Sequence, residues 1–172
     1  DFRYQSMRRK HGDRFAIVSL YTVFGLQGLL MFIVSLPVQL GQVREEPGFG
    51  IIGVLGVLVW GVGIYFEAVG DAQLARFKRD PANTGKIMDQ GLWRYTRHPN
   101  YFGDSCVWWG LGLIAAESSL GIYGLIGPAV MTFLLVKVSG AAMLDRAMLK
   151  RKPGYENYVA TTSGFIPRPP RR

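Results

Sequence analysis

The sequence predicts an all-α fold, a polytopic integral membrane helix bundle with about four spans and additional C-terminal helices on the cytoplasmic side. Long apolar blocks alternate with strongly basic connectors across the 172 residues. About 20 mostly apolar residues cross roughly 30 Å of hydrocarbon, and several blocks reach that length. Of the 20 Lys and Arg residues, 18 lie within 3–14, 76–97 and 146–172.

Three expected spans are nearly uncharged runs. Phe15 to Leu40 has no charge over 26 residues, and Gly48 to Phe66 has none over 19. Gly121 to Leu144 carries only Lys137. These runs predict spans at about 15–40, 48–70 and 121–144, within a single membrane domain covering residues 1–172.

The remaining span needs an earlier start than its apolar run gives. Ser105 to Ala116 offers only 12 uncharged residues. A helix that begins at Pro99 reaches 18, and proline suits the first turn of a helix. We therefore expect a span at 99–116, with Asp104 facing protein rather than lipid.

The charge distribution predicts orientation and excludes other classes of protein. Basic residues collect on the cytoplasmic side of membranes, so both termini are expected there. The net charge of +8 does not indicate a nucleic-acid-binding protein, because the sequence shows no soluble domain that would present this charge to nucleic acid. One cysteine, Cys106, excludes an internal disulfide, and no metal site is expected. The basic start at Asp1 suggests that further N-terminal spans are missing.

The stretch "GLWRYTRHPNYFGD", residues 91–104, concentrates polar side chains at the start of the expected span 99–116. His98 precedes a proline and is expected in extended backbone, while Asn100 and Asp104 share a helical face. A helix N-terminus attracts anionic groups, and Arg97 lies just upstream. A cofactor that carries phosphate or carboxylate would fit here. A capping turn with snorkelling arginines fits the same residues.

A second group lies at the end of the span 48–70. Glu67 and Asp71 are four residues apart, and Leu74 and Lys78 continue the same stripe. Carboxylates at the edge of the hydrocarbon usually face a bundle interior or a water-filled cavity. Lys137, in the last span, either snorkels or faces these carboxylates across the bundle. Alternatively, the helix simply ends in water, and these residues are ordinary solvated charges.

The C-terminal part predicts a short amphipathic helix, a Pro–Gly turn and a second helix that carries Tyr155 and Tyr158. Together with residues 91–104, the terminal "KPGYENYVATTSGFIP" resembles the C-terminal half of the steroid 5-alpha-reductase and sterol C14-reductase superfamily, nearest to its bacterial 5-alpha-reductase-like branch. The likeness covers about Val62 to Pro167, and the bacterial branch implies a location in a bacterial inner membrane. Its most specific element, "RHPNYFGD", is similar to the sterol reductase signature, and "ARFKRDPAN" is similar to the basic segment before it.

The resemblance implies a membrane reductase that binds NADPH in a cavity open to the cytoplasm and reduces a C=C bond of a lipid or sterol-like substrate. An acidic side chain would protonate the carbon or the carbonyl oxygen. The candidate catalytic residues are Glu67, His98, Tyr101 and Asp104. The candidate cofactor-binding residues, with Lys137 added from its position, are Asp71, Lys78, Arg79, Lys86, Arg97, His98, Asn100, Tyr101, Asp104, Lys137, Tyr155 and Tyr158.

Two other functions stay open at this point. Isoprenylcysteine carboxyl methyltransferases, which bind S-adenosylmethionine, belong to the same superfamily and share the "RHP" turn. Their pattern favours two glutamates before the final helix, where this chain has Asp145 and Arg146, so the resemblance favours a reductase. The chain would otherwise be a non-catalytic lipid-binding or complex subunit, because function resides in the site and not in the fold. The lipid itself and the oligomeric state are left open.

Overall fold

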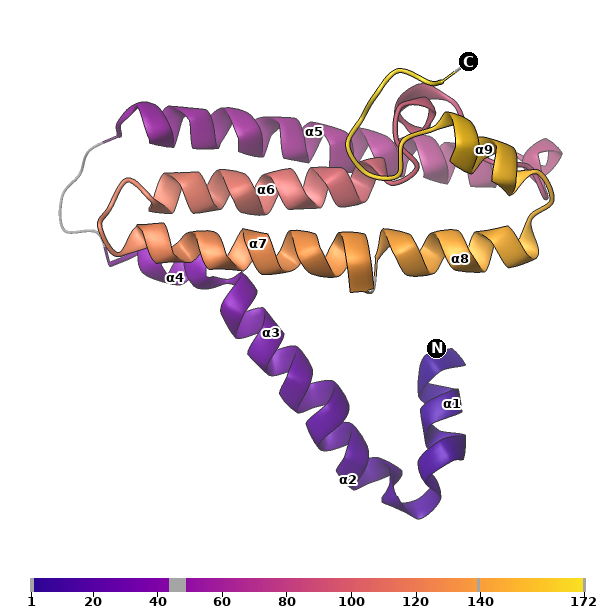
Figure 1. Ribbon diagram of the computed structural model, residues 1–172, viewed down its shortest axis with the longest axis horizontal. Helices are drawn as coiled ribbons and strands as arrows, with labels where there is room; N and C mark the ends of the chain where they lie inside the picture. The colour runs from indigo at the N-terminus through magenta and orange to yellow at the C-terminus, as the bar shows by residue number, and fades with distance from the viewer. Residues whose placement is uncertain (1, 44–48, 139, 172) are drawn as a thin grey trace.

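The computed structural model describes residues 2–43, 49–138 and 140–171, and every regular element in these ranges is a helix. Helices α5, α6 and the α7–α8 pair run side by side, while α2 and α3 leave this bundle at an angle (Figure 1). The longer elements are α1 (Phe2–His11), α2 (Phe15–Ser19), α3 (Leu26–Val34), α4 (Leu36–Gly41), α5 (Ile51–Arg79), α6 (Pro99–Ala115), α7 (Ile126–Phe133), α8 (Ala141–Arg151) and α9 (Tyr155–Thr161). Short 3₁₀ or π turns join them at η1 (Gly12–Arg14), η2 (Leu20–Gly25), η3 (Pro81–Asn83), η4 (Gly91–Arg94), η5 (Gly121–Leu125) and η6 (Leu134–Val138).

Among the described residues, three helical stretches are long and apolar enough to cross a membrane: Tyr4–Val34, Ile51–Arg79 and Gly121–Arg151. The all-α membrane bundle expected from the sequence is therefore confirmed. Helix α6 begins at Pro99, as its sequence predicts, and has 17 residues, so its crossing of the bilayer stays a prediction.

The first apolar run is interrupted where the sequence analysis expected one span. The backbone leaves the helical region at Ser35, and Pro37 then sits in the first turn of α4. Because proline cannot donate an N–H to the preceding turn, it favours a new helix start over continuation. Helix α4 packs against η5 and α6 instead of extending α3.

Helices α5 and α6 form the closest pair in the bundle, and glycines make this approach possible. A Cβ on Gly63 would lie 2.7 Å from the carbonyl oxygen of Gly103, and one on Gly110 would lie 2.6 Å from that of Gly56. Each helix places its glycines seven residues apart, which keeps them on one stripe over two turns. Small residues on such a stripe let membrane helices pack backbone to backbone. We call these four residues the glycine seam.

The close contact of α5 with α6 continues beyond the glycine seam to the polar end of the bundle. A Cβ on Gly70 of α5 would meet the Pro99 ring at 3.2 Å, so the first turn of α6 rests directly on α5. Thr96, at 0% exposed, and His98, at 1%, are fully buried at this end. By contrast, Ile51 at the opposite end of α5 is 81% exposed, as suits a side chain that faces lipid.

Replacing Gly63 by alanine should destabilise the fold by about 1–3 kcal/mol, the usual cost of overpacking a tight interface. The added Cβ would stand 2.6 Å from the backbone nitrogen of Val107. Gly61 is the matched control, because a Cβ there has no atom within 4 Å. Thermal unfolding in detergent should show a lower midpoint for Gly63→Ala and little change for Gly61→Ala. Equal midpoints would mean that the seam is not a packing constraint.

Candidate functional site

The chain before α6 is held against α5 by two hydrogen bonds. The indole N–H of Trp93, in η4, donates to the carbonyl oxygen of Gly70 over 3.0 Å. The backbone N–H of Leu92 donates to Oε1 of Gln73 over 2.9 Å. These contacts fix the loop that leads into the turn Arg97–His98–Pro99, so the positions of Arg97 and His98 follow from α5.

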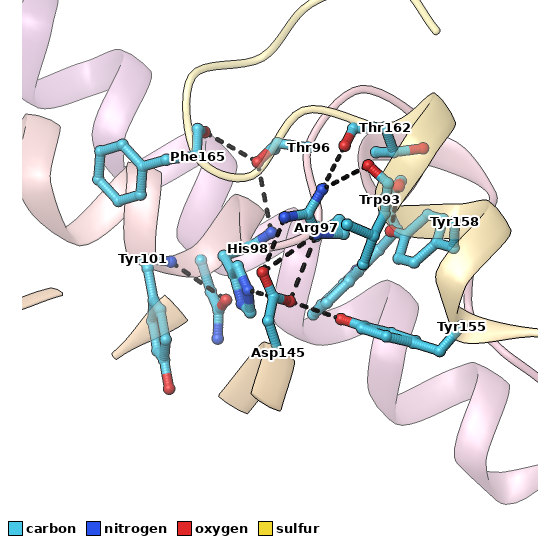
Figure 2. Close-up of polar contacts among 12 residues, drawn as sticks. Trp93, Thr96, Arg97, His98, Tyr101, Asp145, Tyr155, Tyr158, Thr162 and Phe165 are labelled. Carbon is cyan, nitrogen blue, oxygen red and sulfur yellow. Dashed lines mark hydrogen bonds and ion pairs between the residues drawn. The ribbon is translucent and has the colours of Figure 1, made fainter. Parts of the chain in front are cut away.

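Asp145 of α8 is the centre of the polar cluster at this end (Figure 2). Its Oδ2 accepts from Nη2 of Arg97 over 2.8 Å and from Nε over 3.2 Å. Its Oδ1 lies 3.0 Å from Nε2 of His98 and accepts the hydroxyl of Tyr155 over 2.7 Å. The side chains of Arg97 and Asp145 are 10% and 16% exposed. One carboxylate therefore joins the start of α6, helix α8 and helix α9.

Arg97 also binds the chain that follows α9. Its Nη1 donates to the carbonyl oxygens of Val159 and Thr162. Its backbone N–H donates to the carbonyl oxygen of Ser163 over 2.9 Å, and the neighbouring Thr96 hydroxyl donates to that of Phe165 over 2.8 Å. The guanidinium is thus fully engaged by a carboxylate and main-chain carbonyls.

The two tyrosines of α9 complete the cluster. Their rings meet edge to face at 5.6 Å, and the hydroxyl of Tyr158 donates to the carbonyl oxygen of Trp93. Burial raises the pKa of Tyr155 well above its usual range, and the hydrogen bond to the Asp145 carboxylate adds to this. Burial likewise raises the pKa of Tyr158. Both phenols are therefore neutral donors at physiological pH.

A cavity of about 390 Å³ opens beside this cluster. Its wall carries four cationic side chains, and none of the described residues that line it is acidic. Aromatic and aliphatic side chains supply the rest, so the cavity offers an apolar floor with positive charge around it. The lining residues are Leu74, Phe77, Lys78, Asn83, Thr84, Gly85, Lys86, Ile87, Met88, Trp93, Arg97, His98, Leu144, Met148, Lys152, Tyr155 and Tyr158. We call it the main cavity.

The structure brings half of the candidate cofactor-binding residues to the main cavity. These six are Lys78, Lys86, Arg97, His98, Tyr155 and Tyr158. Tyr101 does not line it but stacks on His98, with the ring centres 5.4 Å apart and the planes at 8°. Of the four candidate catalytic residues, only His98 reaches the cavity wall.

The other candidates lie elsewhere. Asn100 donates from Nδ2 to Oδ1 of Asp71 over 3.1 Å, which links α6 to α5 outside the cavity lining. Glu67 and Asp104 lie on α5 and α6, further into the apolar part of the bundle. Neither of them lines the main cavity. Arg79 and Lys137 are exposed, and within the described part of the chain neither forms an ion pair.

Sequence reasoning missed the residue that organises the site. Asp145 was considered only as a poor match to a glutamate pair, although it is the only acid in the otherwise basic and apolar helix α8. A single acid among Arg146, Lys150 and Arg151 was a signal for a specific partner. Lys152 was missed as well; its Nζ donates to the carbonyl oxygen of Lys86 across the cavity mouth.

Comparisons with known proteins agree with a membrane enzyme superfamily. The model of a family described as "Protein of unknown function (DUF1295)" matches residues 1–162. The chain is 33% identical over 98 residues to the "Probable O-methyltransferase ustE" of Ustilaginoidea virens. That alignment covers 56% of this chain and 32% of the relative, so the chain spans about a third of its length. No solved structure matches.

Replacing Asp145 by asparagine should destabilise the protein by about 3 kcal/mol, because removal of one partner leaves the largely buried Arg97 charge uncompensated. Glu156→Gln is the control, since Glu156 is an exposed acid on the adjacent helix α9. Thermal unfolding followed by tryptophan fluorescence should separate the two variants by several degrees. An Asp145→Asn protein as stable as Glu156→Gln would contradict a central role for this carboxylate.

The raised pKa values of Tyr155 and Tyr158 predict late ionisation of two phenols. A group whose pKa is raised in the folded state contributes stability below its unfolded pKa, here about 10, and loses it as pH rises further. Spectrophotometric titration should show a late component that disappears in Tyr155→Phe/Tyr158→Phe. The control Tyr95→Phe/Tyr123→Phe, which alters two exposed tyrosines, should leave the late component in place. A late component that persists without Tyr155 and Tyr158 would contradict the assignment.

Proposed function

Because the chain belongs to the DUF1295 family, a steroid 5-alpha-reductase-like family, we propose that it is a membrane-embedded enzyme that uses NADPH to reduce a C=C bond of a lipid or sterol-like substrate. The observation that carries the choice of cofactor is the charge of the main cavity. Its lining includes Lys78, Lys86, Arg97 and Lys152 and, among the described residues, no carboxylate.

The main cavity fits the chemical parts of NADPH. The dinucleotide carries a pyrophosphate and a ribose phosphate, which lysine ammonium groups can hold as point charges. Lys78 and Lys86 are exposed at the mouth, and they are the natural partners of these phosphates. Trp93 and Tyr155 offer flat faces for the rings. S-adenosylmethionine, which carries a sulfonium cation and no phosphate, matches this charge less well.

The chain's own residues would hold the reacting parts in place. His98 is fixed between the Asp145 carboxylate and the Tyr101 ring, so it presents a rigid polar wall to the cavity. The Tyr155 hydroxyl is committed to Asp145, which leaves its ring to contact the ligand. When bound, NADPH supplies the hydride.

The proton would come from the carboxyl group of Glu67. Glu67 lies seven residues before Leu74 on α5, which is two helical turns and about 10 Å deeper along the same face. Asp104 of α6 lies across the helix pair from Glu67, because the backbone of its neighbour Gly103 contacts the backbone of Glu67. A proton held on Glu67 Oε would face an apolar substrate in the bilayer, while the cofactor occupies the main cavity.

We propose that the main cavity opens on the cytoplasmic side, where NADPH is available. The positions of the basic residues support that side, and the likeness to the bacterial branch of the superfamily supports a bacterial inner membrane.

A specific observation favours one alternative, methyl transfer from S-adenosylmethionine. The relative at 33% identity is named as an O-methyltransferase. The feature of the sequence that counted against this reaction was Asp145 in place of a glutamate pair. Asp145 nonetheless contacts both the arginine and the histidine of the "RHP" turn. The absence of a glutamate pair therefore counts less strongly against methyl transfer than the sequence suggested.

Calorimetric titration of the detergent-solubilised protein should show binding of NADPH. Lys78→Gln/Lys86→Gln should weaken it about tenfold or more, because each charge-assisted hydrogen bond contributes about 1.5–3 kcal/mol. The control Lys10→Gln/Lys150→Gln removes two exposed lysines outside the main cavity and should bind like the unmodified protein. Binding of S-adenosylmethionine alone would replace reduction by methyl transfer. Folded protein that binds neither would indicate a subunit without chemistry of its own.

A further inference from the structure

A second, smaller cavity lies between α9 and the C-terminal segment that follows it. Its volume is about 270 Å³. Arg97 lines both cavities, so the guanidinium belongs to the wall that they share. The lining residues are Arg97, Val159, Ala160, Thr161, Thr162, Ser163, Gly164, Arg168, Pro169 and Arg171. We call it the tail cavity.

The tail cavity is built by a defined fold of the C-terminal segment. The backbone N–H of Arg171 donates to the carbonyl oxygen of Thr161 over 2.8 Å, and that of Arg168 donates to the carbonyl oxygen of Tyr95 over 3.0 Å. These bonds return the chain to the end of α9 and to the turn before α6. In consequence the segment encloses a space with Arg168 and Arg171 on its wall, and is not a loose end.

The charges on this wall are unbalanced. Three arginines line the tail cavity, and none of the described lining residues is acidic. Arg97 is neutralised by Asp145, and its N–H groups are directed to that carboxylate and to carbonyls. Arg168 and Arg171 form no ion pair within residues 2–43, 49–138 and 140–171. Two guanidinium groups therefore remain available to an outside ligand.

The rest of the wall is polar and supplies hydroxyl groups. Thr162 and Ser163, which both carry hydroxyl groups, line the wall at the end of α9 beside Gly164. The hydroxyl of Thr161 is already used, since it donates to the carbonyl oxygen of Asn157 over 2.9 Å. Two hydroxyls beside two unpaired arginines form a set of hydrogen-bond donors with excess positive charge.

We propose that the tail cavity binds a phosphate group. The planar guanidinium matches phosphate oxygens in a two-point geometry, and hydroxyls complete the tetrahedral set of contacts. The ligand is either a free phosphate or the headgroup of an anionic phospholipid. The second source suits the position of the segment, because the Phe165 ring contacts Phe102 at 6.0 Å, in the first turn of the apolar helix α6. This site is separate from the cofactor site and does not depend on the proposed reaction.

The test is performed on the full chain in two forms. Detergent-solubilised protein is titrated with inorganic phosphate by calorimetry. Protein in nanodiscs of phosphatidylcholine, with or without phosphatidic acid, is followed by thermal unfolding. The variant Arg168→Gln/Arg171→Gln removes the two available cations. Arg146→Gln/Arg151→Gln is the charge-matched control, since both residues are exposed on α8 and line neither cavity.

Arg168→Gln/Arg171→Gln should weaken phosphate binding, or reduce the stabilisation by phosphatidic acid, about tenfold, while the control retains it. If inorganic phosphate binds the protein in detergent, the ligand is a free phosphate. If only phosphatidic acid in nanodiscs stabilises the protein, the ligand is a lipid headgroup. Lys78→Gln/Lys86→Gln tests the other cationic cavity and should leave this binding intact. The proposal is overturned if neither ligand binds, if Arg168→Gln/Arg171→Gln binds like the control, or if only the lysine variant loses binding.

Discussion

The ion pair between Asp145 and Arg97 is the interaction on which the polar end of this protein depends. It joins residues 48 positions apart, and each partner recruits further groups: His98 and Tyr155 at the carboxylate, main-chain carbonyls at the guanidinium. The start of α6, helix α8, helix α9 and the C-terminal segment therefore meet at one point. Because the pair is largely buried, loss of one partner costs far more than loss of a surface ion pair.

The glycine seam plays the complementary role along the apolar length of the bundle. Water provides no driving force between helices in lipid, so close van der Waals contact must hold them together. Gly63 and Gly103 allow that contact, and Gly70 seats Pro99 on α5. The seam sets the position of the turn from which Arg97 and His98 project. The polar site is thus precise because it stands on a rigid pair of helices.

The sequence predicted the elements better than the contacts between them. Helix α6 starts at Pro99, and a Pro–Gly turn separates α8 from α9, as local residue types indicated. Residues of the 91–104 stretch and of α9 did converge on a cavity. The central role of Asp145 was not predicted, because its pairing with Arg97 across 48 residues leaves no periodic pattern in the sequence. The glycine seam did leave one, a seven-residue interval in both helices, which a search for small residues would have found.

The glycine seam also constrains how molecules move through the bundle. Where a single methyl group would collide with the facing backbone, an acyl chain or a sterol ring has no passage between α5 and α6. A lipid that approaches Glu67 from the bilayer must therefore travel along the outer surface of this pair or past α7. If the bundle opens to admit a lipid, the opening is therefore expected between this pair and the helices around it, and not between α5 and α6.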